Sequence, residues 1–77
     1  MNEYSLDKLP LNKNGYIIDL KSKDSLRRRM LDLGLVKDTA IKPVFINPSG
    51  DPRAYEVRGS VIAIRKNDAK LIGVSVD

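Results

Sequence analysis

Turn-forming residues recur at short intervals along this chain and leave room only for short elements of secondary structure. They group at residues 13–15, 37–39, 47–52, 58–59 and 66–69. Glycine, asparagine, aspartate and proline end helices and strands because they favour left-handed or proline-fixed backbone conformations. Short strands joined by tight turns are typical of a small barrel, since closure of the sheet removes exposed edges.

The length and composition bound the class of protein. The chain has 77 residues, which allows one domain over residues 1–77. A domain of this size buries only about 60% of the surface that its unfolded chain exposes, so a compact binding module is expected rather than an enzyme with a deep pocket. There is no cysteine and no histidine, which excludes disulfides, thiolate chemistry and the commonest general base and metal ligand. We therefore expect no enzymatic activity, no metal and no other cofactor.

The same composition indicates where the protein works. A small chain without cysteine suits the reducing cytosol. The longest apolar runs, such as Val61–Ile64, are far too short to span a membrane, and the first residues lack the pattern of a signal peptide. We expect a cytoplasmic protein that does not insert into the membrane.

Alternating apolar residues predict five strands. They cover residues 15–20, 40–46, 54–57, 61–65 and 71–76. In the first, Tyr16, Ile18 and Leu20 are expected to share one face. Pro43 lies inside the second and offers no N–H to a sheet, which predicts a bulge or an unpaired edge position there. An unpaired edge at that strand would also permit weak self-association.

One substantial helix is predicted over residues 24–33. Its expected core-facing stripe consists of Leu26, Met30 and Leu33. Ser22 or Asp24 is the expected N-cap, because the side-chain oxygen of such a residue accepts an unpaired N–H of the first turn. Gly34 is expected to end the helix in the left-handed conformation.

The positive charge is concentrated just before this helix and in its first half. Of 14 basic and 10 acidic residues, five bases and one acid lie in residues 21–29, so that stretch carries the whole net charge of +4. Arg27 and Arg28 point away from the predicted stripe. Such a cluster is either a solvated helix surface or a site that attracts nucleic acid, anionic lipid or an acidic protein face. Only 5% of the residues are aromatic, and aromatic side chains are what stack on exposed bases, so the composition disfavours nucleic acid as a partner.

Several short motifs resemble, in their order and spacing, one known family. Arg29–Leu35 fits a helix end of the form Arg-Leu-x-x-Leu-Gly-Leu, with methionine at the second position. Further matching segments are Thr39, Gly50–Pro52, Arg58–Gly59, Ala63–Arg65, Asp68–Ala69 and Ile72–Val74. Together they cover roughly residues 6–76. The chain resembles the FeoA family, small cytosolic proteins associated with the bacterial ferrous iron transporter FeoB.

The resemblance implies a fold and a function. The fold is a mainly β, SH3-like five-stranded β-barrel with one short α-helix after the first strand. The implied function is that of a non-enzymatic accessory protein of ferrous iron uptake. It would bind the cytosolic part of FeoB, the G domain or its surroundings, and regulate the transporter or support its assembly. The alternatives are a small nucleic-acid-binding SH3-like barrel that uses residues 21–29, and a free regulatory domain that binds a repressor of the DtxR type.

Eight residues are candidates for partner contact. They are Arg27, Arg28, Leu35, Val36, Pro48, Gly50, Asp51 and Pro52. Leu35 has a structural alternative, which is to complete the core, and Gly50 has another, which is to serve backbone geometry. Arg27 or Arg28 could also act as an arginine finger on a GTPase.

One turn departs from the family pattern. The family pattern has a Pro-Gly-Thr turn after the helix, whereas this chain has Lys37 and Asp38 before Thr39. Aspartate tolerates a left-handed turn position better than most residues, so the turn is expected to survive, with less rigidity than proline would give.

Overall fold

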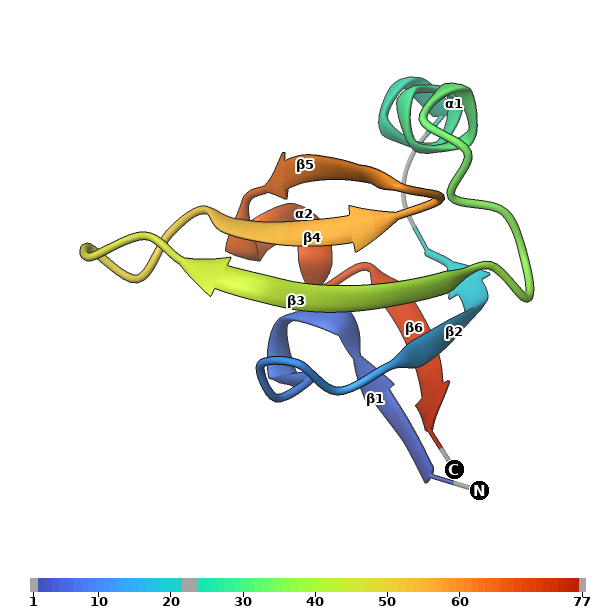
Figure 1. The fold of residues 1–77 in the computed structure, drawn as a ribbon. Coiled ribbons are helices and arrows are strands. Elements are labelled where there is room, and N and C mark those ends of the chain that lie inside the picture. Colours follow the sequence, from blue (N-terminus) through green and yellow to red (C-terminus); the bar gives the residue numbers. More distant parts are fainter. Residues whose placement is uncertain (1, 22–23, 77) are drawn as a thin grey trace.

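The computed structural model describes residues 2–21 and 24–76, which form a strongly bent sheet with a helix at one side (Figure 1). The strands are β1 (Asn2–Ser5), β2 (Gly15–Leu20), β3 (Ala40–Ile46), β4 (Arg53–Val57), β5 (Ser60–Ile64) and β6 (Ile72–Val76). The helices are the 3-10 turn η1 (Leu6–Lys8), α1 (Asp24–Asp32) and the single turn α2 (Lys66–Ala69). Neighbouring strands are antiparallel and follow the order β1-β6-β2-β3-β4-β5.

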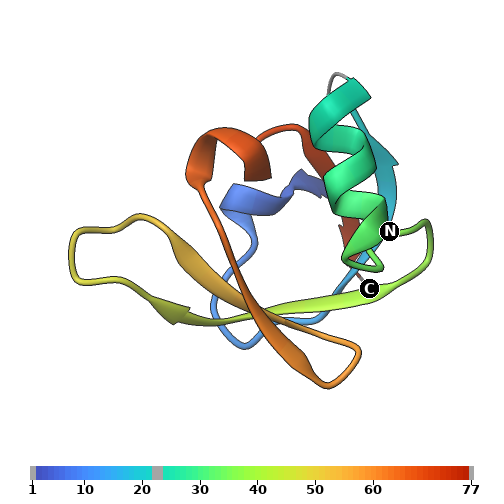
Figure 2. The same cartoon turned by 90° about the horizontal axis from the view of Figure 1, so that it is seen from above.

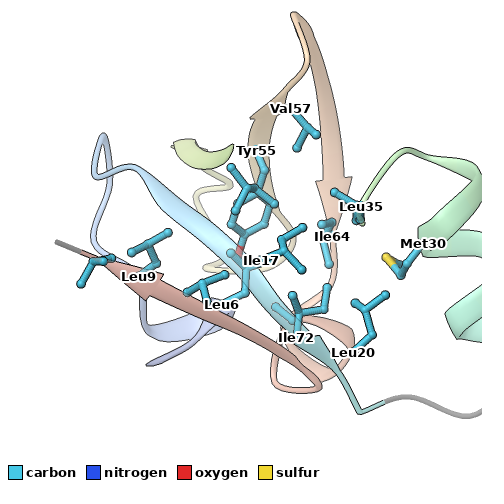
Figure 3. Packing of buried hydrophobic residues seen from close by; sticks show 14 residues of the cluster. Leu6, Leu9, Ile17, Leu20, Met30, Leu35, Tyr55, Val57, Ile64 and Ile72 are labelled. Atoms are coloured by element: carbon cyan, nitrogen blue, oxygen red, sulfur yellow. The ribbon is translucent and has the colours of Figure 1, made fainter. Parts of the chain in front are cut away.

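The sheet surrounds one hydrophobic core. Its buried members are Leu6, Leu9, Ile17, Leu20, Met30, Leu35, Ile41, Tyr55, Val57, Ile64, Ala69, Ile72, Val74 and Val76. Figure 3 shows that they come from the strands, from the N-terminal segment and from the end of α1. The alternating apolar residues of β6 supply three of them, as the sequence predicts.

The mainly β, SH3-like architecture is confirmed, with one correction to the strand count. The sheet has six strands because Asn2–Ser5 pairs with β6 over its whole length. The helix α1 therefore follows the second strand and not the first. The segment of β1 has one apolar residue, Tyr4, and gives no alternation from which a strand could be inferred.

The faces of β2 also differ from the prediction. The strand has the predicted bounds, but its register with β6 shifts between Ile17 and Asp19. A bulge of this kind inserts one extra residue and changes which side chains face the core. Ile17 and Leu20 are therefore both buried, whereas Tyr16 is exposed, so Tyr16 and Leu20 do not share a face.

Strand β3 contains the bulge that its proline predicts. Its register with β4 shifts between Pro43 and Phe45. The strand is nevertheless internal, because Ala40 and Ile41 pair with β2 and the rest of the strand pairs with β4. From Lys42 to Ile46 the strand pairs with β4 alone, so the weak self-association expected of an unpaired edge at β3 stays a prediction.

The helix α1 ends in a left-handed glycine, as predicted. Gly34 has a φ of +87°, and its N–H donates to the carbonyl oxygen of Leu31 at 2.9 Å. The N–H of Leu35 donates to the carbonyl oxygen of Met30 at 3.0 Å. These two bonds form a Schellman motif, which typically brings the residue after the glycine against the last helical turn. The predicted cap residue Ser22 lies outside the described residues, as does the side chain of Asp24.

The predicted stripe of α1 is right in two positions and wrong in the third. Met30 is buried and Leu26 is half-buried against the core, but Leu33 is 42% exposed. The helix ends at Asp32, so Leu33 falls in the turn that leads to Gly34 and no longer follows the helical period. Leu35 takes the place in the core that Leu33 was expected to fill.

Candidate functional site

The eight candidate contact residues lie in two separate parts of the molecule. Arg27, Arg28, Leu35 and Val36 belong to α1 and the segment that follows it, whereas Pro48, Gly50, Asp51 and Pro52 form the loop between β3 and β4. Figure 2 shows α1 on one side of the molecule and this loop protruding on the other. The structure therefore does not unite them in a single site.

The first part combines positive charge with exposed apolar side chains. We call it the helix-end surface and define it as Arg27, Arg28, Leu31, Leu33 and Val36, all of which are exposed. Ser25, Arg27, Arg28 and Leu31 line a shallow hollow on the outer face of α1. The surface therefore presents both the cations and the apolar contacts that a protein partner with an acidic patch requires.

Arg27 also has a structural role in this surface. Its Nη1 donates to the carbonyl oxygen of Leu20 at 2.9 Å, which ties the start of α1 to the end of β2. Arg28 shares its exposure, and no salt bridge of Arg28 occurs within the described residues. Arg28 is therefore the freer of the two guanidinium groups for contact with a partner.

Two members of the helix-end surface escaped the sequence analysis. Leu31 lies outside the predicted stripe, and Leu33 was assigned to the core. The sequence did contain a signal for Leu31, because an apolar residue outside the core-facing stripe is expected to be exposed on the helix surface. The exposure of Leu33 depends on where the helix ends, which is set by Gly34 and Leu35 together.

Leu35 completes the core, as its structural alternative states. Its side chain is 0% exposed, and Figure 3 shows it within the cluster near the end of α1. Val36, which follows it, is exposed. Of these two adjacent candidates, only Val36 offers a side chain to a partner in this conformation.

The loop between β3 and β4 uses its candidate residues largely for its own structure. The Asp51 carboxylate accepts a hydrogen bond of 2.8 Å from the N–H of Lys66, the first residue of α2. Gly50 has a φ of +91° and its N–H donates to the carbonyl oxygen of Asn47 at 2.7 Å, so the turn requires it. Pro52 is half-buried and follows a cis peptide bond, whereas Pro48 is exposed.

The turn before β3 tolerates the departure from the family pattern. The N–H of Thr39 donates to the carbonyl oxygen of Val36 at 3.1 Å, and Asp38 has a φ of +71°. A positive φ at the third of four residues is the signature of a type II turn, for which proline and glycine are the favoured central pair. Lys37 and Asp38 occupy those two positions, and Asp38 adopts the left-handed conformation that was expected of it.

A partly buried polar cluster around Arg53 was not foreseen. The Arg53 guanidinium donates to the carbonyl oxygens of Leu6 at 2.7 Å and Leu9 at 2.8 Å, and to the Tyr55 hydroxyl at 3.0 Å. Burial raises the pKa of the Tyr55 hydroxyl above its ordinary value of 10.0, although the hydrogen bond and the charge of Arg53 oppose that shift. All three hydrogen bonds go to groups of the chain itself, so the cluster holds the fold together.

The described residues offer no metal site or membrane span. Across residues 2–21 and 24–76, no three acidic side chains gather where they could hold a metal ion. In the same part of the chain, neither α1 nor α2 has the length and apolar character needed to cross a bilayer.

Comparison with known proteins decides the family. The FeoA domain family matches residues 4–76. The chain belongs to the FeoA family. A FeoA-like protein from Clostridium acetobutylicum is similar to it with 30% sequence identity and a TM-score of 0.88, over 99% of this chain and 88% of the other. The FeoA protein from Chlorobium tepidum has 29% identity and a TM-score of 0.89, over 95% and 70% of the two chains. No curated protein sequence matches this chain.

A third relative bears on fold and function together. FeoA from Stenotrophomonas maltophilia, solved with zinc, has 30% identity and a TM-score of 0.79, over 94% of this chain and 89% of the other. It is described as a prokaryotic SH3 domain protein and a candidate ferrous iron transport activating factor. The SH3-like fold of this FeoA-family chain agrees with that description, and the family is one of small accessory domains of ferrous iron transport.

The fold also occurs in larger regulators. IdeR from T. acidophilum contains a region with a TM-score of 0.86 and 22% identity, which corresponds to 35% of that chain. At this identity the likeness concerns the fold alone.

Proposed function

We propose that this protein is a cytoplasmic, non-enzymatic accessory protein that binds the cytosolic part of the FeoB transporter, at the G domain or its surroundings. It would regulate the transporter or support its assembly. The observation that carries the proposal is membership of the FeoA family over residues 4–76. The helix-end surface adds a physical reason, because Arg27 and Arg28, two of the five bases in residues 21–29, are exposed on it and neighbouring cations attract an acidic partner.

We propose the helix-end surface as the contact, in preference to the loop between β3 and β4. The side chains of Arg28 and Val36 are exposed and make no hydrogen bond or salt bridge within the described residues. Asp51, by contrast, is engaged by the N–H of Lys66. A partner that bound through the Asp51 carboxylate would have to break this hydrogen bond. The free energy lost in breaking it would lower the affinity of a contact at the loop.

The experiment is a calorimetric titration of the protein into the purified cytosolic domain of its cognate FeoB, with GDP and then with a non-hydrolysable GTP analogue. Saturable binding supports the proposal, and a preference for one nucleotide indicates regulation of the GTPase. Arg28→Glu and Val36→Asp are expected to weaken binding about tenfold each, equivalent to about 1.4 kcal/mol. Pro48→Ala, an exposed change in the other candidate region, is the matched control and is expected to bind as the parent does.

The results also test the alternatives. If Pro48→Ala weakens binding while Arg28→Glu does not, the loop and not the helix-end surface is the contact. Absence of binding in both nucleotide states overturns the proposal for the cytosolic domain. Binding to nucleic acid that weakens steeply as salt rises would then support the small nucleic-acid-binding barrel, although the exposed aromatics Tyr4, Tyr16 and Phe45 lie on strands and not on α1.

A further inference from the structure

Strand β5 forms one outer edge of the sheet. Within residues 2–21 and 24–76 it pairs with β4 alone, from Arg53 opposite Ile64 to Val57 opposite Ser60, and the pairing has no register shift. Figure 1 shows β5 as the uppermost strand, above β4 and β3. An outer strand presents N–H and C=O groups that can pair with another chain.

The hairpin turn identifies which backbone groups are free. The two residues between β4 and β5, Arg58 and Gly59, have φ values of +52° and +82°, which is typical of a type I′ turn. In such a turn the flanking residues, Val57 and Ser60, form the hydrogen-bonded pair. Hydrogen-bonded and non-hydrogen-bonded pairs alternate along an antiparallel ladder. The N–H and C=O groups of Val61 and Ala63 therefore point away from β4.

The strand itself carries none of the sequence features that commonly protect an edge from pairing. The sequence of β5, Ser60–Ile64, contains no charge and no proline, whereas proteins commonly shield an edge with charges, proline or a bulge. Val61 is 62% exposed and Ala63 is exposed. Ala63 also lies in a cross-strand row with Ala54 and the 58% exposed Phe45, which extends the apolar surface across three strands.

The two ends of this edge are basic. Arg58 precedes the strand, Arg65 and Lys66 follow it, and all three are exposed. If a second copy paired here with Val61 opposite Ala63, antiparallel geometry would place Arg58 opposite Lys66 of the second copy. Like charges directly opposite each other destabilise a strand pair. The charges therefore disfavour a second copy and favour a strand with acidic ends.

We propose that the free edge of β5 binds an extended segment of a partner protein as an added antiparallel strand, with apolar residues in its centre and acidic residues at its ends. Main-chain hydrogen bonds to Val61 and Ala63 supply affinity, and alternate side chains supply specificity, as in other cases of strand addition. This site lies on β5 and does not involve the helix-end surface, so the proposal is independent of the proposed contact with FeoB.

The direct test uses amide hydrogen exchange. The probe is a synthetic peptide with an alternating valine and threonine centre and glutamates at both ends. On binding, the amides of Val61 and Ala63 are expected to gain protection, while that of Ile62, which already pairs with β4, changes little. Binding without added protection at Val61 and Ala63, or no binding at all, overturns the proposal.

Substitution gives a second readout. Ala63→Pro removes the outward N–H and is tolerated at an edge, because the ladder with β4 does not use that group. It is expected to weaken peptide binding about tenfold, whereas the control Ala63→Ser keeps the N–H and is expected to bind as the parent does. Val61→Pro provides the same test if Ala63→Pro does not fold. Equal binding by the proline variants and the serine variant contradicts strand addition.

Charge and self-pairing are tested with the same peptide. Arg65→Glu is expected to weaken binding a few-fold at low salt and less at high salt, while Lys13→Glu, an exposed change in the loop before β2, is expected to have no effect. A peptide with lysines in place of the glutamates is expected to bind more weakly. Equal affinity for both peptides would contradict the proposed preference for acidic residues at the ends of the partner segment. If the amides of Val61 and Ala63 gained protection with rising protein concentration in the absence of peptide, the edge would pair with a second copy instead.

Discussion

The guanidinium group of Arg53 donates a hydrogen bond of 2.7 Å to the carbonyl oxygen of Leu6, 47 residues earlier in the chain. A second donor of the same group reaches the carbonyl oxygen of Leu9 at 2.8 Å. These bonds join β4 to the N-terminal segment around η1. Strands β1 and β5 are the two ends of the sheet order and do not pair with each other in the described residues. Arg53 therefore links two parts of the chain that the strand ladders leave unconnected.

Replacement of Arg53 is expected to cost a large share of the stability. Arg53→Met keeps much of the side-chain volume but leaves the carbonyl oxygen of Leu9 and the Tyr55 hydroxyl without the Arg53 donor, and leaves the carbonyl oxygen of Leu6 with the N–H of Leu9 alone. Unpaired buried acceptors are costly, so we expect the free energy of unfolding to fall by about 3 kcal/mol, measured by urea denaturation. Arg28→Met is the control at an exposed position, and equal midpoints for the two variants would contradict the role assigned to Arg53.

Tyr55 is expected to make the protein less stable in strong base. Burial raises the pKa of its hydroxyl above 10.0 in the folded state, with Arg53 opposing the shift. Below about pH 10 the hydroxyl is neutral in both states and its contribution is fully present. As pH rises from there through the folded-state pKa, the unfolded chain ionises first and the free energy of unfolding falls.

Urea denaturation across this alkaline range measures the effect. The Tyr55→Phe variant is expected to be less stable near neutral pH, because Arg53 loses an acceptor, but to lose less further stability as pH rises. If the variant and the parent lose stability in parallel above about pH 10, the loss comes from other groups and not from Tyr55.

The Asp51 carboxylate is expected to stabilise the start of α2. It accepts a hydrogen bond of 2.8 Å from the N–H of Lys66. The N-cap residue Arg65 makes no side-chain capping bond, so Asp51 supplies the cap in its place. Asp51→Ala is expected to lower the free energy of unfolding by about 1 kcal/mol, the usual cost of losing a helix cap. Asp51→Asn keeps an acceptor oxygen and serves as the control. Equal midpoints of thermal denaturation for Asp51→Asn and Asp51→Ala would show that the hydrogen bond contributes nothing.

The strands that alternate regularly could be read from the sequence, because side-chain period and burial agree there. The bounds of β2 and β3, the left-handed Gly34 and the bulge at Pro43 all follow from local chemistry. The faces of β2 could not be read, since the bulge beside Ile17 arises from pairing with β6. The local sequence therefore predicted the bounds of these strands. It did not predict which side chains face the core where pairing with another strand decides the register.

The candidate site was less predictable than the fold. Arg28 and Val36 are exposed as a contact requires, but Leu35 belongs to the core. Asp51 looked like a loop residue free to bind, and its bond to Lys66 depends on how the loop between β3 and β4 meets α2. Arg53 carried no signal at all, because its three acceptors come from distant or buried parts of the chain. Exposure and tertiary hydrogen bonds are properties of the packed molecule, which no single segment encodes.

The turn at Lys37 and Asp38 provides a test in the opposite direction, towards greater stability. Asp38 has a φ of +71°, a conformation that costs a residue with a side chain about 1–2 kcal/mol and costs glycine nothing. Glycine gives back part of that gain through its greater freedom in the unfolded chain, so Asp38→Gly is expected to raise the free energy of unfolding by about 0.5–1 kcal/mol. Asp38→Ala is expected to lower it, because alanine lacks the polar side chain that eases the left-handed conformation. Urea midpoints in the order glycine, aspartate, alanine would support this account, whereas a glycine variant no more stable than the alanine variant would refute it.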